Sequence, residues 1–307
     1  MITRFKRGKA LAHFSNLTRD QINTNIHMFT EDIHLAIMPI GGRTKKQPNF
    51  QIQFEGDEAS CRKALDLYRS ISTYQRQDAI ELICDVIDRI ASYLAWHGEA
   101  FYEIIFDKSQ GKYFLEYFSN ENLFRVPGYY IQLVPPKDYE HFKKRAIFLP
   151  SGGIWKISIP SVLSGSSGYK KMLSKLKRFD NLGPKFYYSD LENNIQSKHF
   201  NFQESVLNTK IYFRRATRAW GWNGRDYSLT NCTEFFVFYK IITFKWAQAI
   251  LREHIINEMN NLLSRLQIKA TIKVLGLPLS KEILQIREML SEGKISFEQA
   301  NTRTSLL

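Results

Sequence analysis

The sequence has few cysteines and no long apolar run. The first feature argues against a disulfide-stapled protein, and the second argues against a membrane-spanning one. Cys61, Cys84 and Cys232 lie far apart and form no C-x-x-C pair. A disulfide framework is therefore excluded, and we expect reduced thiols in a cytoplasmic setting. The most apolar stretch, Phe235 to Leu251, is interrupted by lysine and glutamine. No stretch approaches the roughly 18 apolar residues that a membrane span requires, and the basic N-terminus lacks the apolar core of a secretory signal.

The chain also lacks the motifs of common catalytic and metal sites. It contains no G-x-S-x-G, no H-E-x-x-H and no cluster of cysteine and histidine. His254 falls on the apolar stripe of a predicted helix, which is typical of a core histidine with a hydrogen-bond partner. Asp85 and Asp88 are interpreted as a solvated helix face. We therefore predict that the chain is not an enzyme and uses no cofactor and no metal.

One segment, Gly165 to Lys171, superficially resembles a phosphate-binding loop. It lacks the G-x-x-x-x-G-K-[ST] spacing that wraps backbone amides around a phosphate. We predict that Ser164 to Gly168 form a turn leading into a basic helix over Tyr169 to Phe179. Such a helix start either holds a single backbone phosphate or is simply the entry to the helix.

Positive charge is what the sequence has in excess. Lysine and arginine number 43 against 30 aspartates and glutamates, which gives a formal net charge of +13. This excess attracts polyanions, and the candidates in order are nucleic acid, an acidic protein and an anionic membrane surface. Two basic clusters provide our candidate nucleic-acid-binding residues. They are Lys170, Lys171, Lys175, Lys177, Arg178, Arg214, Arg215 and Arg218.

Within the first cluster, Lys171, Lys175 and Arg178 recur at helical spacing, so they form one charged stripe. The stripe lies to one side of an apolar row made by Met172, Leu173, Leu176 and Phe179. We interpret the stripe either as a surface that contacts the phosphates of a nucleic acid without recognising its base sequence or as a solvated helix face.

The second cluster precedes the aromatic turn Trp220 to Arg225. Aromatic rings beside arginines can stack on bases. Two tryptophans in a glycine-rich turn are also typical of a packed corner or a protein–protein anchor. Both interpretations stay open at this point.

Hydrophobic periodicity predicts a mixed α+β fold. A polar loop is expected over Gly41–Pro48, and residues 180–231 are expected to be extended or loop. The predicted elements are a strand at Phe50–Phe54, helices at Cys61–Ser70 and Asp78–Trp96 with Gly98 as terminator, a hairpin over Ala100–Phe118, strands at Tyr129–Val134 and Ile154–Ile159, one very long or two abutting helices over Thr233–Leu266, a strand at Ala270–Val274 and a closing helix from Ser280.

The segment DRIASYLAWHGEAFYEII, residues 88–105, resembles the helix, glycine break and first strand of tailed-phage portal proteins. Tyr117–Phe124 stands where the family has the segment after its second strand, without the usual proline. Gly165–Tyr169 looks like the turn before the family's middle helix, and Glu288–Ser296 looks like its late helix end.

The resemblance implies a portal-like α+β fold with β-hairpins and a long C-terminal helix. The residue patterns divide the chain into a basic arm (1–20), an α/β region (21–163) that the resemblance makes wing-like, a basic helix with an extended segment (164–231) and a C-terminal region with the long helix (232–307). The resemblance implies a ring of identical subunits at one capsid vertex of the virion. Double-stranded DNA passes through that ring during packaging and ejection, and the packaging motor and capsid or tail adaptor proteins dock on it.

Two other classes remain open from the sequence. One is a cytoplasmic, non-ring accessory protein that binds nucleic acid in replication, mobility or defence. The other is an enzyme whose motifs are too dispersed to read. No membrane partner is expected in any of these cases.

Overall fold

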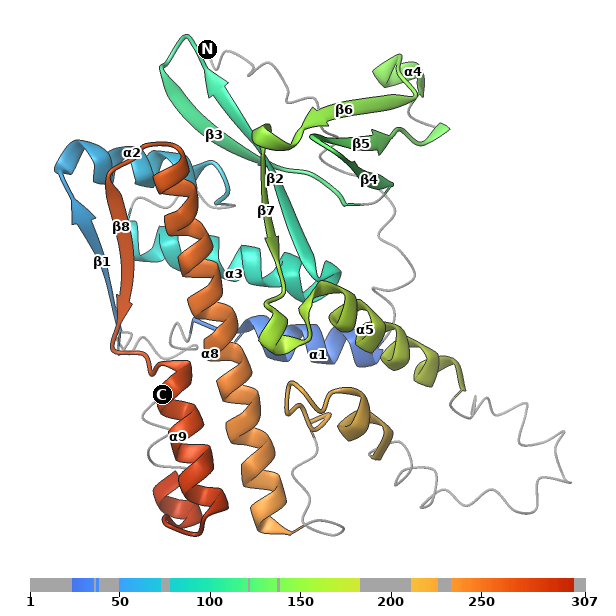
Figure 1. Cartoon of the computed structure of the whole chain (residues 1–307), viewed down its shortest axis with the longest axis vertical. Helices are drawn as coiled ribbons and strands as arrows, with labels where there is room; N and C mark the ends of the chain where they lie inside the picture. The colour runs from blue at the N-terminus through green and yellow to red at the C-terminus, as the bar shows by residue number, and fades with distance from the viewer. Residues whose placement is uncertain are drawn as a thin grey trace, which may run out of the picture. The chain divides into compact units, whose positions relative to one another are not determined.

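A computed structural model of the chain describes residues 24–35, 37–38, 50–72, 78–120, 122–136, 139–182, 211–225 and 233–300. The fold is mixed α+β, with helices and small antiparallel sheets (Figure 1). The chain forms two compact units. Unit 1 contains Met1–Leu17, Ile33–Pro160 and Leu251–Leu277, and unit 2 contains Thr18–Asp32, Ser161–Ile250 and Pro278–Leu307. The predicted arm (1–20) and the predicted loop at Gly41–Pro48 lie outside the described residues.

The described residues of unit 1 form three sheets, all antiparallel. The first pairs β1 with β8, the second has β2 between β3 and β7, and the third has β5 between β4 and β6. The strands span Gln51–Gly56 (β1), Glu99–Asp107 (β2), Lys112–Tyr117 (β3), Leu123–Val126 (β4), Tyr129–Leu133 (β5), Ala146–Pro150 (β6), Ile154–Ser158 (β7) and Ala270–Leu275 (β8). The predicted strands and hairpin are confirmed, whereas β4 and β6 were not predicted.

Local capping fixes the ends of helices α2 and α3 in unit 1. Helix α2 (Glu58–Arg69) starts after Asp57, whose carboxylate accepts a hydrogen bond from the Ser60 amide at 2.8 Å. Helix α3 (Ala79–His97) ends at Gly98, which adopts the left-handed conformation with φ of 73°. The Gly98 amide donates to the carbonyl of Leu94 at 2.8 Å. The predicted terminator is confirmed, because a left-handed helix end favours glycine.

Unit 1 packs around the second half of α8 (Glu234–Arg265), of which residues 251–265 belong to this unit. The buried Tyr68 hydroxyl donates to the carbonyl of Met259 at 2.7 Å. His254 Nε2 donates to the carbonyl of Ser158 at 2.9 Å, so the predicted hydrogen-bond partner is present, although the His254 side chain is half-buried and not part of the core. The interpretation of Asp85 and Asp88 as a solvated face is wrong. Both are half-buried, and burial raises the pKa of Asp88 above its ordinary value.

Unit 2 is helical in the part of the chain that the structure describes. Its elements are the first nine residues of α1 (Thr24–Leu35), η4 (Ser161–Leu163), α5 (Gly165–Leu182), a helix over 211–216, the first half of α8 and α9 (Ser280–Ser291). The short elements α4 (Tyr139–Phe142) and η3 (Ser151–Gly153) belong to unit 1. One unbroken α8 confirms the long-helix prediction, and α9 begins at Ser280 as predicted.

Two predictions for unit 2 are wrong. The segment Ser164–Gly168 is not a turn, because α5 already begins at Gly165. A Cβ at residue 168 would lie 2.7 Å from Ser164 Cβ, so this glycine satisfies a packing need within the first helical turn. Residues 211–216 are helical, although residues 180–231 were expected to be extended or loop. The periodicity there was too short to reveal a helix of that length.

Candidate functional site

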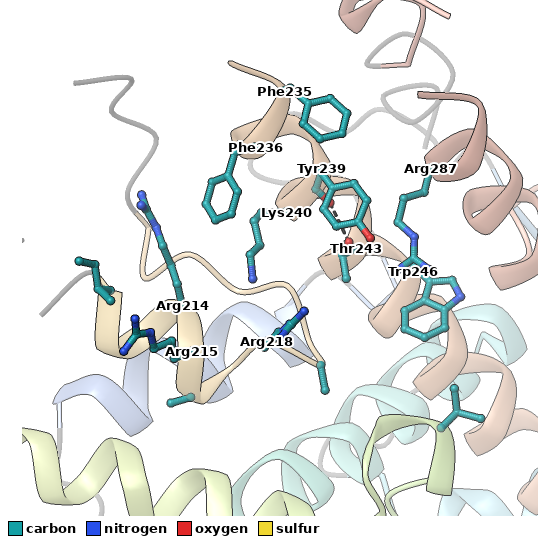
Figure 2. A pocket seen from close by; sticks show the side chains of 14 residues that line it. Arg214, Arg215, Arg218, Phe235, Phe236, Tyr239, Lys240, Thr243, Trp246 and Arg287 are labelled. Atoms are coloured by element: carbon teal, nitrogen blue, oxygen red, sulfur yellow. Dashed lines mark hydrogen bonds between the residues drawn. The ribbon is translucent and has the colours of Figure 1, made fainter. Parts of the chain in front are cut away.

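A cavity of about 1060 Å³ in unit 2 brings together cationic and aromatic side chains (Figure 2). Within the described residues, no aspartate or glutamate lines it. Its cations are Arg214, Arg215, Arg218, Lys240 and Arg287, and its aromatic side chains are Phe235, Phe236, Tyr239 and Trp246. The cavity therefore combines high positive charge with apolar walls.

Two elements hold the opposite walls of this cavity. The three arginines come from the helix over 211–216 and the turn after it, and α8 supplies Lys240. The turn approaches α8 closely at Gly221, where a Cβ would lie 2.6 Å from Thr243 Cβ and 2.8 Å from the carbonyl oxygen of Lys240. Only glycine permits this approach, and Gly221 also has a φ of 74°. The short turn thus sets the arginines opposite Lys240.

Aromatic rings hold several of the cations in place. The guanidinium of Arg287, on α9, lies 5.0 Å from the ring centroid of Trp246 and 5.6 Å from that of Tyr239. Arg214 and Lys240 both lie near Phe236, at 5.2 and 5.7 Å from its centroid. These cation–π contacts orient positive groups without neutralising them.

Lys240 is the least usual member of the site, because its side chain is a buried cation. Only 7% of the residue is exposed. In the part of the chain that the structure describes, no carboxylate pairs with its ammonium group. Burial lowers the pKa of Lys240, and the charges of Arg218 and then Arg214 lower it further. Figure 2 shows Lys240 extending from α8 into the space between these two arginines.

The predicted basic residues of α5 lie on the helix next to this arginine segment, since the Tyr212 hydroxyl donates to the carbonyl of Lys175 at 3.1 Å. Lys170, Lys171 and Lys175 are exposed, and Lys177 is half-buried. The side chain of Arg178 lies outside what the structure describes. Beside the stripe, Met172, Leu173 and Leu176 are buried as the apolar row. Both predicted basic clusters therefore belong to unit 2, on neighbouring helices.

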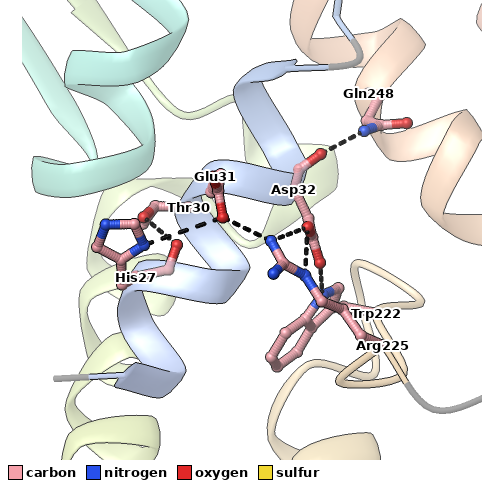
Figure 3. Close-up of polar contacts among 7 residues, drawn as sticks. All are labelled: His27, Thr30, Glu31, Asp32, Trp222, Arg225 and Gln248. Atoms are coloured by element: carbon pink, nitrogen blue, oxygen red, sulfur yellow. Dashed lines mark hydrogen bonds and ion pairs between the residues drawn. The ribbon is translucent and has the colours of Figure 1, made fainter.

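The aromatic turn is a packed corner, so its tryptophans are not available to stack on bases. Trp220 and Trp222 are buried, and both contact the ring of Phe29. The Trp222 indole donates to Asp32 at 2.8 Å (Figure 3). Arg225 also binds Asp32, and hydrogen bonds to Asp32 and then to Glu31 raise the pKa of its guanidinium. This network fixes the turn that leads from the arginines to α8.

A second surface, in unit 1, is exposed and apolar. In the sheet of β4, β5 and β6, Phe124 pairs with Ile131, which pairs with Phe148, so the three side chains form one row on one face. Phe124 is 52% exposed and Phe148 is 60% exposed. Tyr129 and Leu133 share this face by strand alternation and are also exposed. We name these five residues the apolar face.

The opposite side of the same sheet is buried. Tyr130, Ile147 and Leu149 pack there with Phe101 and Phe118 in one core cluster. The sheet therefore carries apolar side chains on both sides, and those of the apolar face are the exposed ones. An exposed apolar surface of this kind is typical of an interaction site.

No group of three or more histidine, cysteine, aspartate or glutamate side chains in the described ranges could hold a metal ion. Among the helices that the structure describes, none is both long enough and apolar enough to cross a membrane. Comparison with protein-family models and with curated proteins gave no match.

Sequence reasoning identified the three arginines of the cavity but missed Lys240, Arg287 and the aromatic walls. One signal was present: Lys240 interrupts the most apolar stretch of the chain. A lysine in such a run is either solvent-exposed on a helix face or buried for a reason. The sequence does not say which residues it faces, because Arg218 and Arg287 lie 22 positions before it and 47 after it.

Proposed function

We propose that the chain is a portal-type structural protein, which assembles into a ring of identical subunits through which double-stranded DNA passes during capsid packaging and ejection. The segment that resembles portal proteins supports this proposal, because it forms a helix, a left-handed glycine and a β-hairpin in α3, Gly98, β2 and β3. The packaging motor and capsid or tail adaptor proteins would be its further partners. Its location would be the virion.

The apolar face is the observation that carries the proposal. A subunit of a ring must present surfaces to its neighbours, and ring closure uses a different patch on each side of the subunit. The apolar face supplies one candidate patch in a unit that already has its own core. The chain carries a charge of +13, so identical subunits repel each other. We therefore expect assembly to strengthen with salt, which screens this repulsion.

The test of assembly is native mass spectrometry combined with negative-stain microscopy. The wild-type chain should form rings, whereas Phe148→Lys should shift the population toward monomers. Phe148 is already exposed, so the substitution should leave the fold intact. Phe106→Lys is the matched control, because Phe106 is 48% exposed but lies on the sheet of β2.

The control should assemble like the wild-type chain. A sharp monomer peak near 36.0 kDa at every protein and salt concentration, in the presence of a capsid scaffold as well, would rule out the ring. Monomers that still bind DNA would favour the alternative, a non-ring nucleic-acid-binding accessory protein in replication, mobility or defence.

DNA contact is proposed for the stripe of Lys171, Lys175 and Arg178. If each cation meets one phosphate, replacing all three by alanine should reduce the log–log salt slope of duplex binding by about 0.9 per contact, or roughly 2.7 in total. The fold should survive, because α5 packs through its separate apolar row. Fluorescence anisotropy over a salt series measures the slope, and DNA retention in assembled particles provides the second readout.

The matched control replaces Lys63, Lys108 and Lys269 by alanine. These lysines are exposed and scattered over unit 1, so the control removes the same charge without removing a row. If the stripe variant and the control change the slope and the retention equally, the stripe is only a solvated face.

A further inference from the structure

The cavity of unit 2 contains a buried positive charge that ring assembly does not explain. Lys240 is 7% exposed. Four arginines line the cavity with it, and no aspartate or glutamate does so among the described lining residues. Burying an ammonium group without a partner costs several kcal/mol. A bound ligand of negative charge would offset that cost.

We propose that this cavity binds a phosphate group, with Lys240 at its base and Arg215, Arg218 and Arg287 around it. The inference does not depend on ring formation, because every lining residue belongs to one unit of a single chain. A bound phosphate would supply a negative charge, which none of the described lining residues carries. It would also favour the charged form of Lys240, which its surroundings disfavour in the empty cavity.

The chemistry of the side chains favours phosphate over a single carboxylate. A phosphate carries up to two negative charges and several acceptor oxygens, which match several cations at once. Arginine offers a planar fork of donors that fits phosphate oxygens, and lysine offers a compact point charge. The aromatic rings of Phe236 and Trp246 already contact Lys240 and Arg287, so they restrict the positions that these two donors can take.

The cavity is larger than one phosphate. A volume of about 1060 Å³ is at the upper end of the range for small-molecule sites. The rest of the ligand therefore has room beside Phe235, which is 40% exposed. The phosphate could come from a free phosphate compound or from the end of a nucleic-acid strand, and the experiment has one arm for each source.

The first arm measures thermal stability of the full chain with inorganic phosphate and pyrophosphate, against sodium chloride at equal ionic strength. Both phosphates should raise the melting temperature in a saturable way. The apparent affinity should fall about ten- to hundredfold in Lys240→Met, as expected for one lost charged hydrogen bond. Arg218→Gln, at an exposed position, should also weaken binding and guards against a folding defect in the first variant.

The matched control is Lys245→Met. Lys245 lies on the same helix, is half-buried and has a pKa lowered by burial, but it does not line the cavity. Its phosphate response should equal that of the wild-type chain. If Lys240→Met and Arg218→Gln both respond like the wild-type chain, or if phosphate acts no differently from chloride, the proposal is wrong.

The second arm compares a short single-stranded oligonucleotide with and without a 5′ phosphate. A preference for the phosphorylated strand that Lys240→Met abolishes would assign the source to a strand end. Response to the free phosphates alone would assign it to a small phosphate compound. Either result supports the site, and neither bears on the ring, which native mass spectrometry of the same Lys240→Met sample tests separately.

Discussion

Replacing the buried Lys240 by methionine should make the ligand-free protein more stable. Methionine has nearly the same length and keeps the packing of the lysine stem, but it carries no charge. The Lys240 residue as a whole is only 7% exposed in the wild-type chain. It has no carboxylate partner among the described residues, and two arginines repel it. The substitution removes each of these costs.

The magnitude follows from the balance of two contributions. Burial of an unpaired neutral polar group costs roughly 1–3 kcal/mol in mutational data, and this range is a lower bound for the ammonium group. The contact of Lys240 with Phe236, at 5.7 Å, returns about 0.5–1 kcal/mol. We expect a net gain of roughly 1–2 kcal/mol for Lys240→Met. For a chain of this length that corresponds to an increase of roughly 2–6 °C in the melting temperature.

The stability difference between Lys240→Met and the wild-type chain should depend on pH. The folded state holds the pKa of Lys240 below its ordinary value of 10.5, so the unfolded chain binds more protons between the folded pKa and 10.5. Stability contributed by this residue therefore rises with pH across that window. The advantage of Lys240→Met should be largest at neutral pH and should shrink as the pH approaches 10.5.

Differential scanning calorimetry in phosphate-free buffer, at pH 7 and pH 10, measures both effects. Lys245→Met is the control, and its gain should be smaller because Lys245 is only half-buried. A variant at position 240 that is less stable than the wild-type chain at both pH values would refute the reasoning. It would mean that the ammonium has a stabilising partner.

Three further predictions concern positions away from the ammonium group. Burial, with the charges of nearby carboxylates, raises the pKa of Cys84 to about 12, so about one part in ten thousand of this thiol is thiolate at pH 8. Mass spectrometry after brief alkylation should show Cys61 modified and Cys84 unmodified until the protein is denatured. Rapid labelling of Cys84 in the native protein would contradict this. Gly98→Ala places a side chain at a φ of 73° and should cost about 1–2 kcal/mol in urea unfolding. Gly221→Ala should cost more, roughly 2–5 kcal/mol, because it combines a similar backbone strain with a Cβ placed 2.6 Å from Thr243 Cβ. Equal losses of stability for the two variants would mean that the turn at Gly221 can move away from α8.

Local sequence patterns were sufficient for elements whose hydrogen bonds lie within a few residues. The length of α8 followed from a stretch without proline or glycine, and the end of α3 followed from Gly98. The hairpin of β2 and β3 followed from two aromatic-rich and β-branched runs on either side of a turn. In each case the deciding interactions join residues that are near each other along the chain.

Other elements were decided by contacts between distant residues. Strand β1 was predicted, but its partner β8 lies more than 200 positions away, and no local pattern specifies that pairing. The glycine at 168 was interpreted as part of a turn, although its role is to let Ser164 pack inside the first turn of α5. The same residue type serves both needs, so only the backbone path distinguishes them.

The candidate site divides in the same way. The sequence by itself determined that the chain is basic, that its cations cluster and that Arg214, Arg215 and Arg218 form one of the clusters. Only the tertiary structure decided that these arginines face a buried lysine from α8, and that the neighbouring tryptophans are core residues. The physical reason is that charge and periodicity are properties of composition and local order, whereas burial and the absence of a counter-charge depend on which distant segments pack against each other.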